Sequence, residues 1–142
     1  MADIVQLQVA DEESRANINV LLRQLSERIP PCSTELLQQI VGSPVLELWV
    51  VREGTTIVGM GELAITLKPE GVIAQIEDVI VDESQRGKGL GKSISEKLIE
   101  RARARGARVI QLSSNSTRIA ANALYKKLGF ELHQTNVYRL ML

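Results

Sequence analysis

The stretch 77–93 constrains the fold of this chain more than any other. It begins as an apolar, strand-like run and passes through a polar turn, after which Gly87, Gly89 and Gly91 alternate with other residues and a helical pattern begins near Leu90. Glycine lets the backbone turn tightly and approach a ligand closely, and the first turn of a helix offers free N–H groups at the positive end of its dipole. The stretch therefore predicts a strand-to-helix corner that binds a phosphate or pyrophosphate group.

Two common phosphate-binding motifs do not fit this corner. A P-loop that ended at Gly91 and Lys92 would need a glycine where Arg86 stands. A dinucleotide-binding fingerprint that began at Gly87 and Gly89 would need a third glycine in place of Lys92. A glycine-rich turn that caps a helix without binding a ligand is the alternative. Features elsewhere in the sequence must distinguish the two interpretations.

The composition predicts one compact domain over residues 1–142. With 44% hydrophobic residues, a chain of 142 residues can bury a core of its own. The formal net charge is zero, so no overall field attracts nucleic acid or an anionic membrane. We therefore expect neither of these as a partner.

The chain is poor in residues that bind metals. Cys32 is its only cysteine and His133 its only histidine, so we expect no disulfide and no metal site. His133 is interpreted as an exposed strand residue, and Cys32 as a thiol without the histidine partner that a nucleophile needs. A lone cysteine, with no leader or membrane-spanning run in the sequence, predicts a cytoplasmic protein.

Hydrophobic periodicity predicts seven strands and four helices. The expected strands are 4–9, 46–52, 56–67, 72–81, 107–113, 130–135 and 137–142. The expected helices run from residue 11 to the Pro30–Pro31 pair, from residue 32 or 33 to 42, over 90–105 and over 118–128. Strand 72–81, helix 90–105 and strand 107–113 predict a parallel pair with a right-handed crossover, whereas the other strands are joined by short turns. The fold class is thus α/β, with a mixed, mostly antiparallel sheet of six to seven strands.

Two local features refine this fold. Gly59 and Gly61, inside strand 56–67, indicate a bulge or a close approach of the backbone. Arg101, Arg103 and Arg105 are interpreted as the solvated face of helix 90–105.

Two motifs in the C-terminal half resemble those of a known family. The spacing Arg86-x-x-Gly89-x-Gly91 is similar to the loop that binds the coenzyme A pyrophosphate in the GCN5-related N-acetyltransferase (GNAT) family. Further along, the exit of the last helix is similar to the GNAT pattern Ala-x-x-Leu/Phe-Tyr-x-x-Leu-Gly-Phe. The matching residues are Ala121, Leu124, Tyr125, Leu128, Gly129 and Phe130. The resemblance begins at about residue 76 and implies a GNAT fold with acetyl-CoA as co-substrate.

The resemblance also implies which residues bind the coenzyme. The main-chain N–H groups of the corner would hold the pyrophosphate; they belong to Arg86, Gly87, Lys88, Gly89, Leu90, Gly91 and Lys92. The pantetheine arm would pair with Val79, Ile80 and Val81. Near the last helix the expected contacts are Asn115, Arg118 and Asn122. Arg118 stands where relatives often carry asparagine, so either Asn115 binds the pantetheine amides or Arg118 contacts a phosphate.

Tyr125 is the candidate general acid and Glu77 the candidate general base. Tyrosine has an unperturbed pKa of about 10, so at neutral pH it can donate a proton to a thiolate. A tyrosine packed in the core is the alternative. Strand alternation predicts that Glu77 shares a face with Val79 and Val81, opposite Asp78. A structural carboxylate, or a water relay without a dedicated base, remains the alternative for Glu77.

The sequence therefore predicts an N-acetyltransferase that transfers an acetyl group from acetyl-CoA to an amine. The amine, on a small molecule or a peptide, would attack directly in a ternary complex. The helix–proline–helix region 11–42 would, by resemblance, form part of the acceptor wall. A non-catalytic coenzyme A sensor of the same fold is the alternative, and a homodimer is left open.

Overall fold

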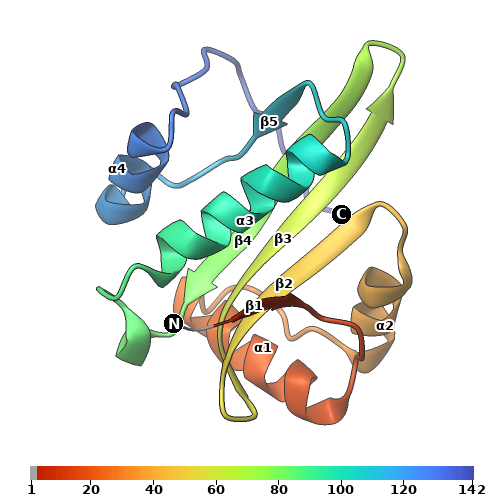
Figure 1. Cartoon of the computed structure of the whole chain (residues 1–142), viewed down its shortest axis with the longest axis vertical. Coiled ribbons are helices and arrows are strands. Elements are labelled where there is room, and N and C mark those ends of the chain that lie inside the picture. Colours follow the sequence, from red (N-terminus) through yellow and green to blue (C-terminus); the bar gives the residue numbers. More distant parts are fainter. Residues whose placement is uncertain (1–2) are drawn as a thin grey trace.

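The computed structural model describes residues 3–142 as a five-stranded sheet with helices on both faces (Figure 1). The strands are β1 (Ile4–Gln6), β2 (Leu46–Glu53), β3 (Thr56–Lys68), β4 (Gly71–Val81) and β5 (Val109–Gln111). The helices are α1 (Glu12–Leu25), α2 (Thr34–Gly42), α3 (Leu90–Ala104) and α4 (Ile119–Lys127), and a short 3-10 turn, η1 (Glu83–Gln85), precedes α3. The α/β class and the four helices are confirmed.

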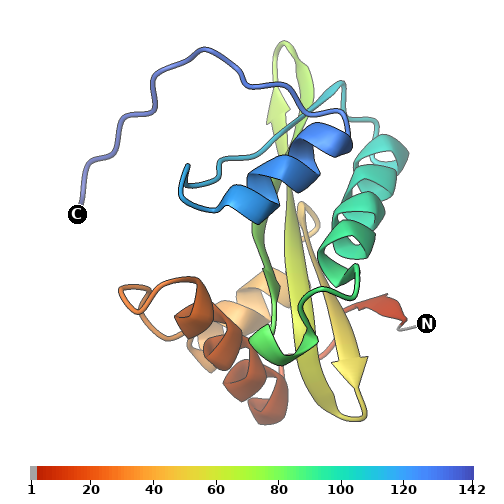
Figure 2. The ribbon, with the colours of Figure 1, turned by 90° about the vertical axis from the view of Figure 1, so that its left-hand side faces the viewer.

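The strands lie in chain order, β1-β2-β3-β4-β5. The first four are antiparallel to their neighbours, and β5 is parallel to β4. Figure 2 shows the sheet nearly edge-on, with α1 and α2 on one face and α3 on the other. Helix α3 connects β4 to β5, so the predicted parallel crossover is confirmed.

The predicted final hairpin, residues 130–135 and 137–142, is wrong, and with it the count of six to seven strands. After α4 the chain continues as an extended arm, which Figure 2 shows leaving the body of the domain. Within residues 3–142, no main-chain hydrogen bond joins residues 131–142 to any other segment. Alternating apolar residues indicate an extended segment, but a lone hairpin is only marginally stable unless a sheet or helix covers its apolar face.

Helices α1 and α2 begin at residues whose side chains cap them. Asp11 accepts a hydrogen bond from the N–H of Ser14 at 2.8 Å, and Ser33 accepts one from the N–H of Leu36 at 3.1 Å. Helices α1, α2 and α3 bury apolar side chains on the sheet, and the core has one cluster on each face. The α1/α2 cluster includes Leu21, Leu37, Leu48, Val50, Met60 and Ile80. The α3 cluster includes Val51, Leu63, Ile76, Val79, Ile94 and Leu98.

Gly61 lets α3 lie close to the sheet. A Cβ atom at this position would lie 2.7 Å from Ile94 Cγ2 and 2.9 Å from Leu98 Cδ1, closer than carbon atoms can pack. The register of β3 against β4 also shifts between Met60 and Glu62. The bulge expected near Gly59 and Gly61 is thus confirmed, while the close approach at Gly61 is made by side chains of α3 rather than by a backbone.

Glu47 fixes α3 along its C-terminal half. This carboxylate on β2 is only 3% exposed and accepts hydrogen bonds from Arg101 Nε at 2.9 Å, Arg105 Nη1 at 2.7 Å and Trp49 Nε1 at 2.9 Å. Burial alone would raise the pKa of Glu47, but these hydrogen bonds outweigh it and lower the pKa to about 2. The solvated interpretation is therefore wrong for Arg101 and Arg105, while Arg103 is exposed as predicted.

Candidate functional site

Strands β4 and β5 diverge at the end of the sheet where α3 begins. They pair only over three residue pairs, the last of them Gln75 with Gln111. Further along, Val79, Ile80 and Val81 lie beside β3 on one side but have no strand partner on the other, within the residues that the structure describes. These three residues line the opening between the strands, where the carbonyls of Val79 and Val81 accept hydrogen bonds from the side chains of Arg118 and Arg86.

A cavity of about 580 Å³ occupies this opening. Its walls come from the end of β4, the corner before α3, helix α4 and the last turn of α1. The lining residues include Gln24, Leu25, Val79, Ile80, Val81, Arg86, Gly87, Gly89, Leu90, Gly91, Lys92, Arg118, Ala121 and Tyr125. Most of the predicted coenzyme residues thus meet at one cavity.

The corner itself presents a row of free donors. Gly87 and Gly89 have φ angles of 81° and 82°, in the left-handed region that favours glycine, and Gly89 is the N-cap of α3 without a side-chain cap. The first helical bond of α3 is donated by the N–H of Ser93 to the carbonyl of Gly89. The main-chain N–H groups of residues 86–92 donate to no acceptor among residues 3–142. Seven consecutive free N–H groups at a helix N-terminus form an anion-binding arrangement.

Basic side chains surround the corner without filling it. Arg86 donates from Nε to the carbonyl of Val81 at 3.1 Å, and Lys88 donates from Nζ to Gln85 at 3.0 Å. Lys92 lines the cavity, whereas Lys88 does not. These exposed cations add positive charge next to the free N–H groups.

Gln24 on α1 holds the segment before the corner, and the sequence analysis missed it. Its Nε2 donates to Asp82 at 2.9 Å, and its Oε1 accepts from the N–H of Glu83 at 3.0 Å. It therefore ties the end of α1 to the turn that leads into the anion-binding corner. Nothing in the local sequence pattern of α1 distinguishes Gln24 from the other polar residues of the helix.

Tyr125 is buried and faces the cavity. Its side chain is 7% exposed, and its ring packs edge-on against Phe130 with a centroid distance of 5.9 Å. Burial raises the pKa of Tyr125, although the charge of Arg118 acts in the opposite direction. The phenol is therefore held in its neutral form, which can donate a proton.

Arg118 reaches into the cavity, whereas Asn115 and Asn122 do not. Arg118 donates from Nη2 to the carbonyl of Val79 at 3.4 Å. Asn115 instead accepts hydrogen bonds from the N–H and hydroxyl of Thr117, and Asn122 donates to the carbonyls of Asn115 and Arg118. The two asparagines thus shape the turn that enters α4, and their part in coenzyme binding stays a prediction.

Glu77 lies on the other face of the sheet from the one predicted. Asp78 has a φ of 49° and adds an extra residue to β4 opposite Gly61, so the alternation of side chains changes at this point. Ile76 and Val79 both pack in the α3 cluster, which places Glu77 on the α1/α2 face. The expectation that Glu77 shares a face with Val79 and Val81 was therefore wrong, because a bulge cannot be read from alternation.

Glu77 forms an acidic group with Glu62 and Asp78. Glu62 on β3 is paired directly with Glu77 and is half-buried, while Glu77 and Asp78 are exposed. Loss of hydration first, and then the charges of Asp78 and Glu77, raise the pKa of Glu62 to about 7. The pKa of Glu77 is raised by the same two causes, desolvation and the charge of Asp78. The sequence analysis missed Glu62, whose signal is a single charge inside an otherwise apolar strand.

The described residues offer no metal site and no membrane span. Across residues 3–142, His, Cys, Asp and Glu side chains form no cluster of three or more that could hold a metal ion. Every helix in the same range is too short or too polar to cross a bilayer.

Comparisons with known proteins agree with this geometry. Residues 14–130 match the model of the acetyltransferase (GNAT) family. The chain is 33% identical to the glucosamine 6-phosphate N-acetyltransferase of Trypanosoma brucei brucei over 94% of its own length and 95% of that protein. It is 32% identical to the IAA acetyltransferase of Azospirillum brasilense, over 80% of this chain and 73% of the relative.

Solved structures of acetyltransferases are also similar to this chain. A Trypanosoma brucei acetyltransferase has a TM-score of 0.80 and 31% identity, over 100% of both chains. A predicted acetyltransferase from Clostridium acetobutylicum, solved with acetyl-CoA, has a TM-score of 0.79 over 99% of this chain and 96% of the other, at 19% identity. The fold and the cavity thus define an acyltransferase. The chain belongs to the GNAT family of acetyltransferases.

Proposed function

We propose that this protein transfers the acetyl group of acetyl-CoA to a primary amine on a small molecule or a peptide. The observation that carries the proposal is the row of free N–H groups over residues 86–92, which borders the opened edge of β4. A pyrophosphate at the corner would satisfy N–H groups that have no acceptor among the described residues, and the pantetheine arm would lie along Val79, Ile80 and Val81.

The amine would attack the thioester carbonyl directly, without an acylated enzyme. Cys32 supports this view, because its thiol is buried and its pKa is raised, chiefly by that burial. A main-chain N–H in segment 79–81 would stabilise the developing oxyanion. As the tetrahedral species collapses, the C–S bond breaks and Tyr125 donates its proton to the leaving thiolate.

Glu62, together with Glu77, would accept the proton of the incoming ammonium. A base is most effective when its pKa lies near the working pH, and the pKa of Glu62 is about 7. The acidic group of Glu62, Glu77 and Asp78 would also attract a positively charged amine. We therefore propose an acceptor that carries its amine as a cation at neutral pH.

Release of free thiol from acetyl-CoA with a library of amines tests this function. Glucosamine 6-phosphate belongs in the library because the similar Trypanosoma protein is named for acetylating it. The expected result is acceptor-dependent thiol release together with an acetylated amine in the mass spectrum. Coenzyme binding by calorimetry, without turnover on any amine, would instead support the sensor alternative, and no binding at all would contradict both.

A further inference from the structure

Arg118 carries a positive charge without a negative partner. Within residues 3–142, its half-buried side chain gives a single hydrogen bond, from Nη2 to the carbonyl of Val79 at 3.4 Å, and forms no ion pair with a carboxylate. The lining of the cavity beside β4 contains no aspartate or glutamate. A guanidinium has five N–H donors and keeps its charge at any working pH, so this one is suited to an anionic partner.

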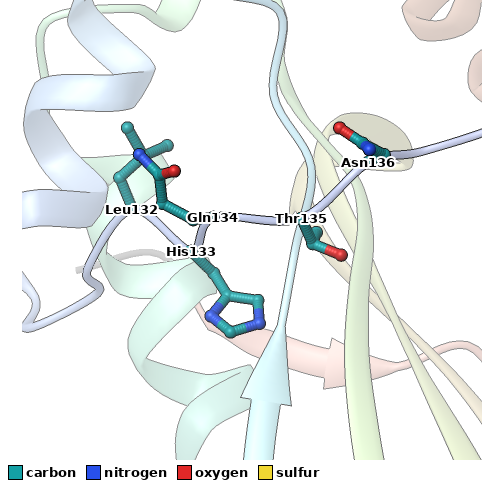
Figure 3. A pocket seen from close by; sticks show the side chains of 5 residues that line it. All are labelled: Leu132, His133, Gln134, Thr135 and Asn136. Atoms are coloured by element: carbon teal, nitrogen blue, oxygen red, sulfur yellow. The ribbon is translucent and has the colours of Figure 1, made fainter.

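The cavity beside β4 differs from a second cavity, which lies along the chain after α4 (Figure 3). The second cavity has a volume of about 420 Å³, and its lining contains no lysine or arginine. It consists of Leu132, His133, Gln134, Thr135 and Asn136. The cavity beside β4 is lined by three basic residues, Arg86, Lys92 and Arg118. An anionic group is therefore expected in the cavity beside β4.

The hydrogen bond to Val79 places Arg118 at the inner end of the proposed coenzyme path. The anion-binding corner, residues 86–92, follows the other end of this segment at Val81. Val79 lies two residues, or roughly 7 Å, farther from the corner than Val81. The bulge at Asp78, with the acidic group proposed to receive the amine, comes next. Arg118 thus lies between the two, beside the expected place of the thioester rather than beside a phosphate.

Arg118 also shares its cavity with Tyr125. The two residues are seven positions apart, about two turns of α4, so they lie on the same face of the helix. The charge of Arg118 acts on Tyr125, since it lowers the pKa of this phenol against the effect of burial. The other basic residues of the lining, Arg86 and Lys92, belong to the corner and do not shift this pKa.

We propose that Arg118 contacts the sulfur atom of coenzyme A and stabilises it as the thiolate leaving group. This inference rests on the proposed function and adds a catalytic residue to it. As the tetrahedral species collapses, the C–S bond breaks, its electron pair remains on sulfur, and the proton of Tyr125 passes to the thiolate. Arg118 keeps its own proton throughout. Its fixed charge stabilises first the thiolate and then the phenolate of Tyr125, until water returns a proton to the phenolate.

The ionisation of coenzyme A bound to the full chain tests this contact without any turnover. The thiolate absorbs in the ultraviolet, and a complex with desulfo-coenzyme A, which lacks the sulfur atom, is the blank for Cys32 and Tyr125. We expect the bound thiol to ionise about tenfold less readily in Arg118→Gln than in the wild type, because a neighbouring positive charge favours the thiolate. Arg118→Lys should stay close to the wild type. Arg103→Gln, at an exposed position on α3, is the control and should leave the ionisation unchanged.

Turnover with acetyl-CoA gives a second measurement. Arg118→Gln should lower kcat about 10²-fold and leave the Kd of acetyl-CoA nearly unchanged. Activity should fall at high pH, where Tyr125 loses its proton, and this limb should move to higher pH in the variant, because the charge that lowers the pKa of Tyr125 is gone. S-acetylpantetheine, which carries no phosphate, should show the same loss of kcat.

The variant should fold, because Arg118 begins α4 without a capping hydrogen bond from its side chain. Circular dichroism checks this point, and Arg118→Asn is a second neutral variant. Loss of the fold in both neutral variants would assign Arg118 a structural role and overturn the inference.

Two further results would overturn the inference. Equal thiol ionisation in Arg118→Gln and the wild type would mean that Arg118 does not contact the sulfur. A higher Kd of acetyl-CoA with an unchanged kcat, and no effect on S-acetylpantetheine, would assign Arg118 to a phosphate. In either case, thiol release by the wild type would leave the proposed function in place. A bound thiol whose ionisation depends on Arg118, in a chain that acetylates no amine, would support the contact and contradict the proposed function. Absence of coenzyme A binding would contradict both.

Discussion

Glu62 on β3 lies directly opposite Glu77 on β4, so two carboxylates face each other across neighbouring strands. Like charges in this position destabilise a sheet when both are ionised. The protein carries this pair beside the bulge at Asp78, on the face of the sheet that α1 and α2 cover. Such an arrangement raises the affinity of Glu62 for a proton, which is the property that a general base at neutral pH needs.

Glu62→Gln should therefore lower kcat/KM by about 10² to 10⁴. In the wild type, activity should rise as the pH increases through about 7, where Glu62 loses its proton, and the variant should lack this limb. A pH profile of thiol release measures the difference. Glu96→Gln, at an exposed position on α3, is the matched control and should keep the wild-type profile.

The same variant has a predictable effect on stability. The pKa of Glu62 rises from 4.5 in the unfolded chain to about 7 in the fold, so ionised Glu62 disfavours folding. The free energy of unfolding of the wild type should fall relative to that of Glu62→Gln as the pH rises from 4.5 to 7. Above pH 7 the difference between the two proteins should no longer change. Urea unfolding at pH 5 and pH 8 would show this, and an equal difference at both pH values would contradict it.

Tyr125→Phe should separate catalysis from coenzyme binding. The variant removes only the phenolic hydroxyl and keeps the ring that packs on Phe130, so the fold and the acetyl-CoA affinity should be retained. We expect kcat to fall by about 10² while the Kd of acetyl-CoA by calorimetry is unchanged. Unchanged turnover would assign Tyr125 to the core.

Gly89→Ala should weaken coenzyme binding through the backbone. A Cβ atom at this position would meet nothing within 4 Å, so any effect comes from the φ of 82° rather than from a clash. A left-handed conformation costs a non-glycine residue about 1–2 kcal/mol. The corner should then relax, and the Kd of acetyl-CoA should rise about tenfold in calorimetry.

Gly42→Ala is the control for this variant. A Cβ atom at Gly42 would also meet nothing within 4 Å, but this glycine ends α2 without a positive φ. The variant should bind acetyl-CoA like the wild type and be slightly more stable, since alanine favours helix. Equal weakening in both variants would show that glycine at the corner is not specifically required.

Glu47→Gln should make the free energy of unfolding less sensitive to a fall in pH. The pKa of Glu47 is lowered from 4.5 to about 2 in the fold, so its ionised form stabilises the protein above pH 4.5 and this contribution is lost as the pH falls toward 2. We expect a loss of about 2 kcal/mol in the free energy of unfolding at pH 7, and little difference from wild type near pH 2. Denaturant unfolding at the two pH values measures both.

Local patterns predicted the parts of the site that lie close together in the sequence. The glycine corner, α3 and the turn after α4 each depend on residues within about a dozen positions, where capping and periodicity act. Their assembly at one site was predicted from the family resemblance, and most of the predicted coenzyme residues line one cavity, whereas Lys88, Asn115 and Asn122 do not.

The misses all concern relationships between distant or irregular segments. The pairing of Glu47 with Arg101 joins residues 54 positions apart, which helix periodicity cannot reveal. The face of Glu77 depends on one extra residue at Asp78, and a shift by one residue moves every later side chain to the other face. The final hairpin was predicted wrongly because alternation of apolar and polar residues indicates an extended segment but does not show whether another strand pairs with it.

The close packing at Gly61 determines how α3 lies on the sheet. A methyl group there would push the helix off the sheet at Ile94 and Leu98, while Glu47 restrains its far end. The helix could then only pivot, which would move its N-terminal turn and misalign the N–H groups proposed to bind the pyrophosphate. A residue buried under the middle of α3 would thus control the orientation of the loop at the start of that helix.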